Sequence, residues 1–133
     1  MNPQTNTKIL LVDDDNLVRD VYRRLLGRHF NVSLACGARE ALDLLAAGGP
    51  FAVVMSDFRM PGLSGLELLR HVRSDWPQTS RILLSGQLEI AEMSGDDDLA
   101  RVIGKPYPHS ELIQVLRQAI DEYNLKTCAV TAS

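Results

Sequence analysis

Short apolar runs alternate along this chain with longer stretches in which apolar residues recur every three or four positions. The first run covers residues 8–12 and is closed by the aspartates Asp13, Asp14 and Asp15. A run this short, rich in branched residues and closed by polar ones, indicates a buried strand. Four more strands are predicted on the same grounds, at residues 31–35, 51–55 and 81–84 and around Val102 and Ile103.

The stretches between these runs have helical spacing. The first begins at Leu17, and its apolar residues fall at i, i+4 and i+8, which places them on one helix face. That predicted face consists of Leu17, Val18, Val21, Tyr22, Leu25 and Leu26. Further helices are predicted over residues 38–47, around residues 66–76, briefly around residues 88–93, and over residues 111–123.

Five strands that alternate with five helices predict an α/β fold. Strands that are apolar on both faces favour a parallel sheet covered by helices on each side. Because parallel crossovers are right-handed, a doubly wound open sheet is the simplest topology. The length fits one domain, which we assign to residues 1–125. Residues 126–133 have no apolar period and are predicted to be a flexible C-terminal tail.

Acidic residues stand where two of the predicted strands end. Asp13 and Asp14 follow the first strand, and Asp57 follows the third. In an open parallel sheet the ligand site lies outside the carboxyl ends of the strands, where the winding direction switches. Two like charges about 4 Å apart there repel by roughly 4 kcal/mol at an effective dielectric near 20. We therefore expect the site to recruit a cation, for which Mg²⁺ is suited by its preference for carboxylate and phosphate oxygens.

A hydroxyl and an ammonium group are expected at the same edge. Ser85 follows the fourth strand and Lys105 follows the fifth. Phosphoryl transfer depends mainly on positioning and charge neutralisation, which such groups provide. An acidic triplet alone is more typical of a solvated turn or a helix N-cap. Only the joint placement of these residues, each after a different strand, favours a phosphoryl-transfer site.

Composition and charge exclude several classes of function. The net charge is −3, which gives no electrostatic reason to expect direct binding to nucleic acid or to an anionic membrane. No apolar run approaches the roughly 20 residues that span a bilayer, and the first seven residues are polar, unlike a signal peptide. The two cysteines do not form a CxxC pair. We therefore expect a cytoplasmic protein without disulfides.

Four segments together resemble the receiver domains of bacterial response regulators, the phosphoacceptor modules of two-component signalling. They read ILLVDDD at residues 9–15, SDFRMPGLSG at 56–65, LLSG at 83–86 and KPY at 105–107. The resemblance extends over residues 7–124. It implies a flavodoxin-like fold with strand order 2-1-3-4-5.

The resemblance also implies a role for each residue of the site. Asp57 would accept a phosphoryl group from a histidine kinase or a histidine phosphotransfer protein, and phosphorylation would control a downstream effector that the sequence does not identify. Asp13 and Asp14 would hold Mg²⁺ or Mn²⁺, together with Asp57 and the backbone carbonyl of Arg59. The chain would be a signalling domain that assists its own phosphorylation and dephosphorylation, not an enzyme with a separate substrate.

Two further residues are assigned by the same resemblance. Ser85 would reach toward the phosphoryl group, where the family has Thr or Ser. Lys105 would pair with that group, and the peptide bond between Lys105 and Pro106 is expected to be cis.

The sequence departs from the family in its predicted signalling region. The family usually has an aromatic residue three positions before the lysine, whereas this chain has Val102. The segment between Ser85 and Lys105 is also about two residues shorter than in familiar members. We therefore expect signal output to depend more on the fourth strand and fourth helix than on an aromatic switch.

Two alternative functions stay open on the sequence alone. One is a receiver-like interaction module that works without phosphorylation, which the complete set of site residues argues against. The other is a phosphatase whose nucleophile lies in an Asp-x-Asp loop, a spacing that Asp13 and Asp15 fit. No inserted cap is present to shape a substrate pocket, and Asp57 would then have no role.

Overall fold

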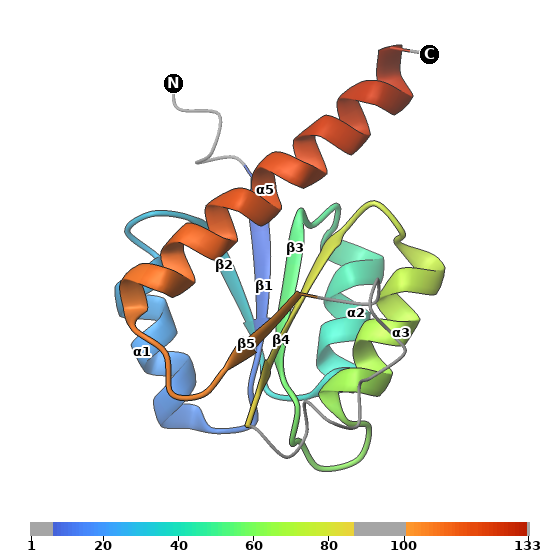
Figure 1. Ribbon diagram of the computed structural model, residues 1–133. Coiled ribbons are helices and arrows are strands. Elements are labelled where there is room, and N and C mark those ends of the chain that lie inside the picture. The colour runs from blue at the N-terminus through green and yellow to red at the C-terminus, as the bar shows by residue number, and fades with distance from the viewer. Residues whose placement is uncertain (1–6, 87–100, 133) are drawn as a thin grey trace.

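The computed structural model describes residues 7–86 and 101–132, with side chains described as far as Thr127. The described elements follow one another as strand and helix along most of the chain (Figure 1). In order they are β1 (Lys8–Val12), α1 (Asn16–Leu26), β2 (Asn31–Ala35), α2 (Ala38–Gly48), β3 (Val53–Asp57), α3 (Gly65–Asp75), β4 (Ser80–Ser85), β5 (Arg101–Gly104) and α5 (His109–Ala132).

The strands form one parallel sheet in the order β2-β1-β3-β4-β5. This order reverses direction beside β1, as a doubly wound sheet does. The register aligns Val12 with Ser56, Asp57 with Leu84, and Ser85 with Gly104. The predicted fold class and strand order are therefore confirmed.

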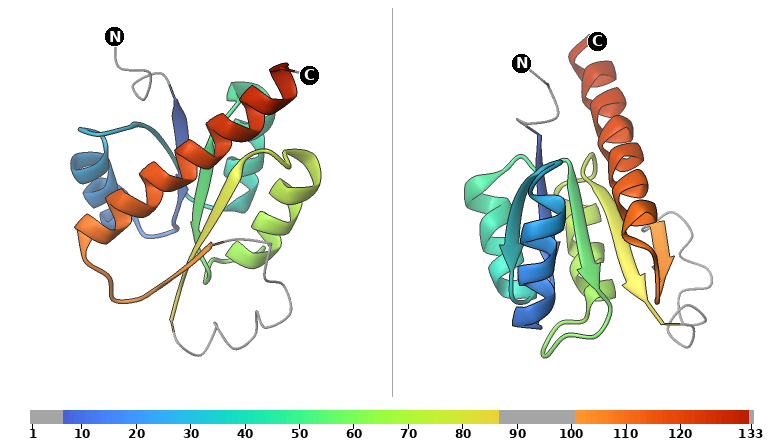
Figure 2. Two further views of the ribbon diagram at one scale, coloured as in Figure 1. Left: turned by 45° about the horizontal axis from the view of Figure 1, so that its top comes forward. Right: turned by 90° about the vertical axis from the view of Figure 1, so that its left-hand side faces the viewer.

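Helices cover both faces of the sheet, two on each side among the described elements (Figure 2). Successive strand residues point to opposite faces. Ile9 and Leu11 therefore pack in one cluster with residues of α1 and α5, whereas Leu10 and Val12 pack in another with residues of α2 and α3. A sheet buried on both faces explains why its strands are apolar throughout.

Element boundaries agree with the sequence prediction for β1 and β2 and differ elsewhere. β3 begins and ends two residues later than the predicted 51–55, so Asp57 is the last residue of the strand. The predicted brief helix at residues 88–93 lies outside the described residues.

The predicted end of the final helix at residue 123 is wrong. α5 continues to Ala132 and projects beyond the sheet (Figure 1). The sequence from His109 to Ala132 contains neither Gly nor Pro, so nothing in it stops the helix. An apolar period is needed to pack a helix against the sheet but not to continue one, and Leu125 is 72% exposed. No helix in the described part of the chain is long and apolar enough to cross a membrane.

The predicted apolar face of α1 is only partly buried. Tyr22 and Leu26 are buried, but Leu17 is 73% and Val21 is 44% exposed. The six apolar positions cover a wider arc than the helix can press against the sheet, so the outermost two face solvent.

Candidate functional site

The candidate site lies at the carboxyl edge of the sheet, where the chain leaves its central strands. Asp13 follows β1 and is 6% exposed, and its backbone N–H donates to the carbonyl of Ala35 at the end of β2 (3.1 Å). Asp57 ends β3 and is 7% exposed, while Ser85 ends β4 and is 1% exposed. Parallel pairing therefore brings to one edge the residues that the sequence predicted there.

The loop between β1 and α1 fixes the position of Asp13. The Asp13 side chain accepts a hydrogen bond from the backbone N–H of Asp15 (2.9 Å). Asp15 in turn caps α1 by accepting from the N–H of Leu17 (2.9 Å). Arg19, one turn along the helix, donates to the backbone carbonyl of Asp13 (2.7 Å). The turn of backbone that carries Asp13 is thus held by the first turns of α1.

The carboxyl group of Asp13 has a raised pKa. Burial is the main cause, and the negative charges of Asp57 and Asp14 raise the pKa further. The hydrogen bond from Asp15 and the positive charge of Lys105 act in the opposite direction without cancelling the effect. Asp13 therefore lies in the combined field of two other carboxylates, as the prediction of a shared crevice requires.

Lys105 forms an ion pair with Asp57. Its Nζ donates to Oδ1 of Asp57, and the lysine side chain is 45% exposed whereas that of Asp57 is 10% exposed. The backbone N–H of Lys105 donates to the carbonyl of Ser85 (2.9 Å), which continues the pairing of β4 with β5. The peptide bond between Lys105 and Pro106 is cis, as the resemblance predicted.

Ser85 lies beside these residues but forms a local hydrogen bond. Its Oγ donates to the carbonyl of Gly86 (3.0 Å). Its neighbour Leu84 is aligned with Asp57 in the sheet register. The structure thus places Ser85 at the predicted edge, while a contact between its hydroxyl and a phosphoryl group stays a prediction.

Two glycines shape the loop after β3. Gly62, which follows Pro61, has a positive φ of 79°, a backbone conformation that residues with a side chain rarely adopt. Gly65 begins α3 directly against β3: its N–H donates to the carbonyl of Phe58 (2.8 Å), and a Cβ there would collide with the carbonyl oxygen of Asp57. Gly65 was not singled out from the sequence, because its importance comes from packing against a residue eight positions away.

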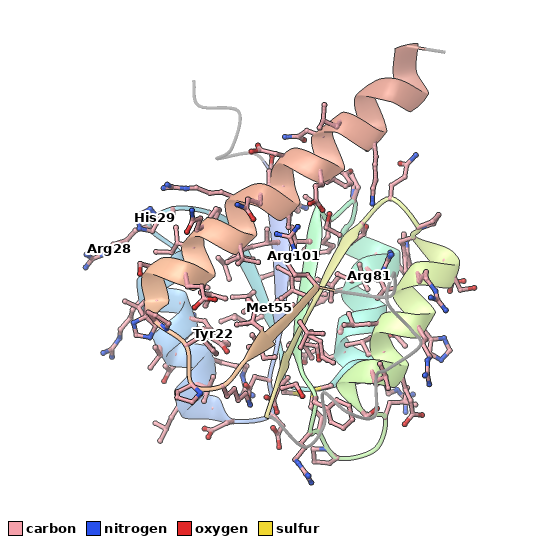
Figure 3. All side chains as sticks on the ribbon, viewed as in Figure 1. Tyr22, Arg28, His29, Met55, Arg81 and Arg101 are labelled. Atoms are coloured by element: carbon pink, nitrogen blue, oxygen red, sulfur yellow. The ribbon has the colours of Figure 1, made fainter. Side chains whose placement is uncertain are left out.

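A pair of tyrosines beside the site was also not predicted. The hydroxyls of Tyr22 on α1 and Tyr107 after β5 are 3.0 Å apart and form a hydrogen bond. Figure 3 shows Tyr22 on the α1 side of the sheet, beside the segment that leads into α5. Burial raises the pKa of Tyr22, and the hydrogen bond to Tyr107 and the charges of Asp13 and Asp57 raise it further. Its phenol is therefore protonated at neutral pH and lies within electrostatic reach of the carboxylates.

The residues present fit a hard divalent cation with few protein ligands. Within the described residues, no group of three His, Cys, Asp or Glu side chains is close enough to enclose a metal. Mg²⁺ does not need such a cage, since it commonly takes one or two carboxylates and completes its shell with water and phosphate oxygens. Asp13 and Asp57 offer those carboxylates at the sheet edge, and Asp14 is exposed beside them. The Arg59 carbonyl as a ligand stays a prediction.

A doubly wound parallel sheet with an acidic site at its carboxyl edge places the chain among flavodoxin-like α/β proteins. The model of the response regulator receiver domain family matches residues 9–117. The chain therefore belongs to the receiver domain family of response regulators.

Curated relatives support this assignment. The chain is 36% identical over 121 residues to the hydrogenase transcriptional regulatory protein HoxA of Cupriavidus necator. The alignment covers 89% of this chain and 25% of HoxA. It is 39% identical over 116 residues to the response regulator MprA of Mycolicibacterium vanbaalenii, covering 83% of this chain and 48% of the relative. The chain thus spans between a quarter and a half of these two relatives.

Solved structures show the same fold. A crystal structure described as adenylate cyclase from Rhodopirellula baltica superposes with a TM-score of 0.89 at 31% identity, covering 96% of both chains. A response regulator receiver domain protein from Clostridium thermocellum superposes with a TM-score of 0.80 at 27% identity, covering 90% of this chain and 98% of that one.

Proposed function

We propose that this receiver domain accepts a phosphoryl group on Asp57 in a reaction that depends on Mg²⁺ or Mn²⁺. The observation that carries the proposal is the ion pair between the buried Asp57 and Lys105, with the carboxyl of Asp13 in the same field. A buried carboxylate beside an ammonium group and a second acid can present a nucleophile and neutralise phosphoryl oxygens in one small crevice.

The chemistry follows from this arrangement. An Oδ atom of Asp57 attacks phosphorus in line, the bond from phosphorus to the donor's histidine nitrogen breaks, and an acyl phosphate forms on Asp57. Lys105, already at Asp57, neutralises negative charge on the phosphoryl oxygens, and the Ser85 hydroxyl lies at the same edge to donate to one of them. Asp13 and Asp57, with the exposed Asp14 beside them, would hold the cation, and the bound cation would supply further charge neutralisation. Water later hydrolyses the acyl phosphate and restores the carboxylate.

The proposed partners are a histidine kinase or a histidine phosphotransfer protein upstream and an effector downstream. The phosphoryl group adds about 1.5 to 2 negative charges at Asp57, which gives the site the means to change a neighbouring surface. HoxA is by name a transcriptional regulatory protein. For this chain, with its net charge of −3, we propose control of a partner or an output domain and no direct contact with nucleic acid.

Mass spectrometry of the intact protein tests the proposal. Incubation with acetyl phosphate and Mg²⁺ should add one phosphoryl group to the parent and to Asp43→Asn, a matched control in which an exposed acid of α2 is changed. The Asp57→Asn variant should gain none. Chelation of the metal should abolish the gain in the parent.

The alternative functions give different results in the same experiment. A folded parent that gains no phosphoryl group, from acetyl phosphate or from a kinase, would favour an interaction module that works without phosphorylation. Steady turnover of unrelated phosphate esters that is lost in Asp13→Asn but kept in Asp57→Asn would favour a phosphatase.

A further inference from the structure

A hydrogen bond between two tyrosine hydroxyls connects α1 to the loop that carries Lys105. Tyr22 and Tyr107 are 85 positions apart in sequence, and their oxygens are 3.0 Å apart. Tyr22 is 5% exposed, and its side chain belongs to the core cluster on the α1 and α5 face. Tyr107 is half-buried and packs against the same cluster. The two hydroxyls are therefore held in place by core packing on α1 and on the loop after β5.

The loop between β5 and α5 has few attachments besides this pair. It comprises residues 105–108, and its backbone is held at one end by the bond from Lys105 to Ser85 and at the other by the bond from Glu111 to Pro108. Within the described part of the chain, the side-chain hydrogen bonds from this loop to other elements are those of Lys105 with Asp57 and Tyr107 with Tyr22. Lys105 and Tyr107 are separated only by Pro106, so a displacement of Tyr107 is transmitted to Lys105.

Tyr22, the other tyrosine of the pair, lies on α1, the helix that also supports Asp13. Arg19 donates from α1 to the carbonyl of Asp13, and Tyr22 lies one turn further along the same helix. α1 therefore holds the acidic side of the site through Arg19 and the lysine side through Tyr22.

We propose that Tyr22 and Tyr107 are a positioning pair that holds Lys105 against Asp57. This inference rests on the proposed phosphoryl transfer at Asp57. It adds two residues that fix the position of the Lys105 ammonium group. Neither tyrosine touches the phosphoryl group; both act through Lys105. Loss of the Tyr107 hydroxyl leaves the buried Tyr22 hydroxyl without its partner, so Tyr107→Phe should have the larger effect. Loss of the Tyr22 hydroxyl leaves one that water can reach on the half-buried Tyr107.

Chemical labelling of lysines tests the pair without any phosphorylation. Trace acetylation with acetic anhydride, followed by mass spectrometry of the Lys105 peptide, reports how often that amine is free of its partner. With Lys8 as the internal reference, Tyr107→Phe should raise Lys105 labelling roughly 2- to 10-fold, the range that one such hydrogen bond shifts an equilibrium. Tyr123→Phe is the matched control, since Tyr123 is also half-buried on α5 but lies beside Trp76 and Thr79 at the opposite edge of the sheet. Unchanged labelling of Lys105 in both Tyr107→Phe and the milder Tyr22→Phe would overturn the proposal.

A double-mutant cycle separates positioning from general destabilisation. Tyr107→Phe should slow phosphorylation by acetyl phosphate several-fold in the parent but have no further effect in a Lys105→Ala background. An equal slowing in both backgrounds would show a merely structural role and sink the inference. If the parent accepts no phosphoryl group, the proposed function fails, while the labelling result still decides whether the pair holds Lys105.

Discussion

At the scale of single residues, the two buried acids of the site differ in their surroundings. Asp57 is buried and forms an ion pair with Lys105, whereas Asp13 lies beside other carboxylates. Asp13 is buried with a backbone hydrogen bond from Asp15 and the charge of Lys105 as compensation, and these do not cancel the effects of burial and of the neighbouring acids. When no cation is bound, a buried carboxylate that lies close to two others lowers the stability of the folded state. The burial of Asp13 therefore does not stabilise the unliganded protein, and under the proposed function it positions a carboxylate for the cation.

Asp13→Asn should stabilise the protein when no divalent cation is present. Burial and neighbouring carboxylates raise the pKa of Asp13, so its contribution favours the folded state at low pH and is lost as the pH rises through the folded pKa. The asparagine oxygen still accepts from the N–H of Asp15. At pH 7 in EDTA, we expect the variant to melt several degrees above the parent, about 1 kcal/mol for a domain of this size. The gap should shrink as the pH falls through the raised pKa of Asp13 and should be closed below about pH 4. An unchanged gap across the pH range would contradict this account of Asp13.

Gly65 should not tolerate even the smallest side chain. A Cβ at this position meets the carbonyl of Asp57, so Gly65→Ala must displace either β3 or the start of α3. We expect a loss of about 1–3 kcal/mol in denaturant unfolding and a slower phosphorylation of Asp57. The control is Gly37→Ala, where the added Cβ meets no atom within 4 Å. Equal effects of the two substitutions would rule out the steric explanation.

At the scale of elements, the sequence predicted the sheet better than the surfaces of its helices. Continuous apolar runs reveal buried strands, and each described strand was located within about two residues. The period of α1 predicted a helix, but it did not show that Leu17 and Val21 lie outside the buried stripe. The end of α5 was missed because an apolar period reports packing, and the helix continues beyond its packed part.

The two sides of α1 should differ sharply in their effect on stability. Leu26→Ala removes a side chain that is 1% exposed and should cost about 2–5 kcal/mol. Leu17→Ala changes one that is 73% exposed and should alter stability by less than about 0.5 kcal/mol. Urea unfolding followed by circular dichroism measures both. A large loss for Leu17→Ala would show that this residue is covered in solution.

At the scale of the whole molecule, the site is assembled from segments that are distant in sequence. Its acids and its lysine were predictable because parallel strands bring their carboxyl ends to one edge. The contact between Tyr22 and Tyr107 was not predictable, because no local pattern indicates which buried hydroxyl meets which. The chain spans 25% and 48% of the lengths of two relatives.

Binding of a divalent cation should reverse the order of stability between the parent and Asp13→Asn. A ligand that binds only the folded state stabilises it by mass action, roughly 1.4 kcal/mol at ten times its dissociation constant. Mg²⁺ should therefore raise the melting temperature of the parent by several degrees and that of the variant by much less, because the variant lacks one carboxylate. Ca²⁺-free EDTA buffer should restore the original order, and NaCl at matched ionic strength controls for screening of the acids. If the parent and Asp13→Asn respond equally to Mg²⁺, Asp13 is not a ligand. Any bound cation is then held by other residues, and the burial of Asp13 is unrelated to metal binding.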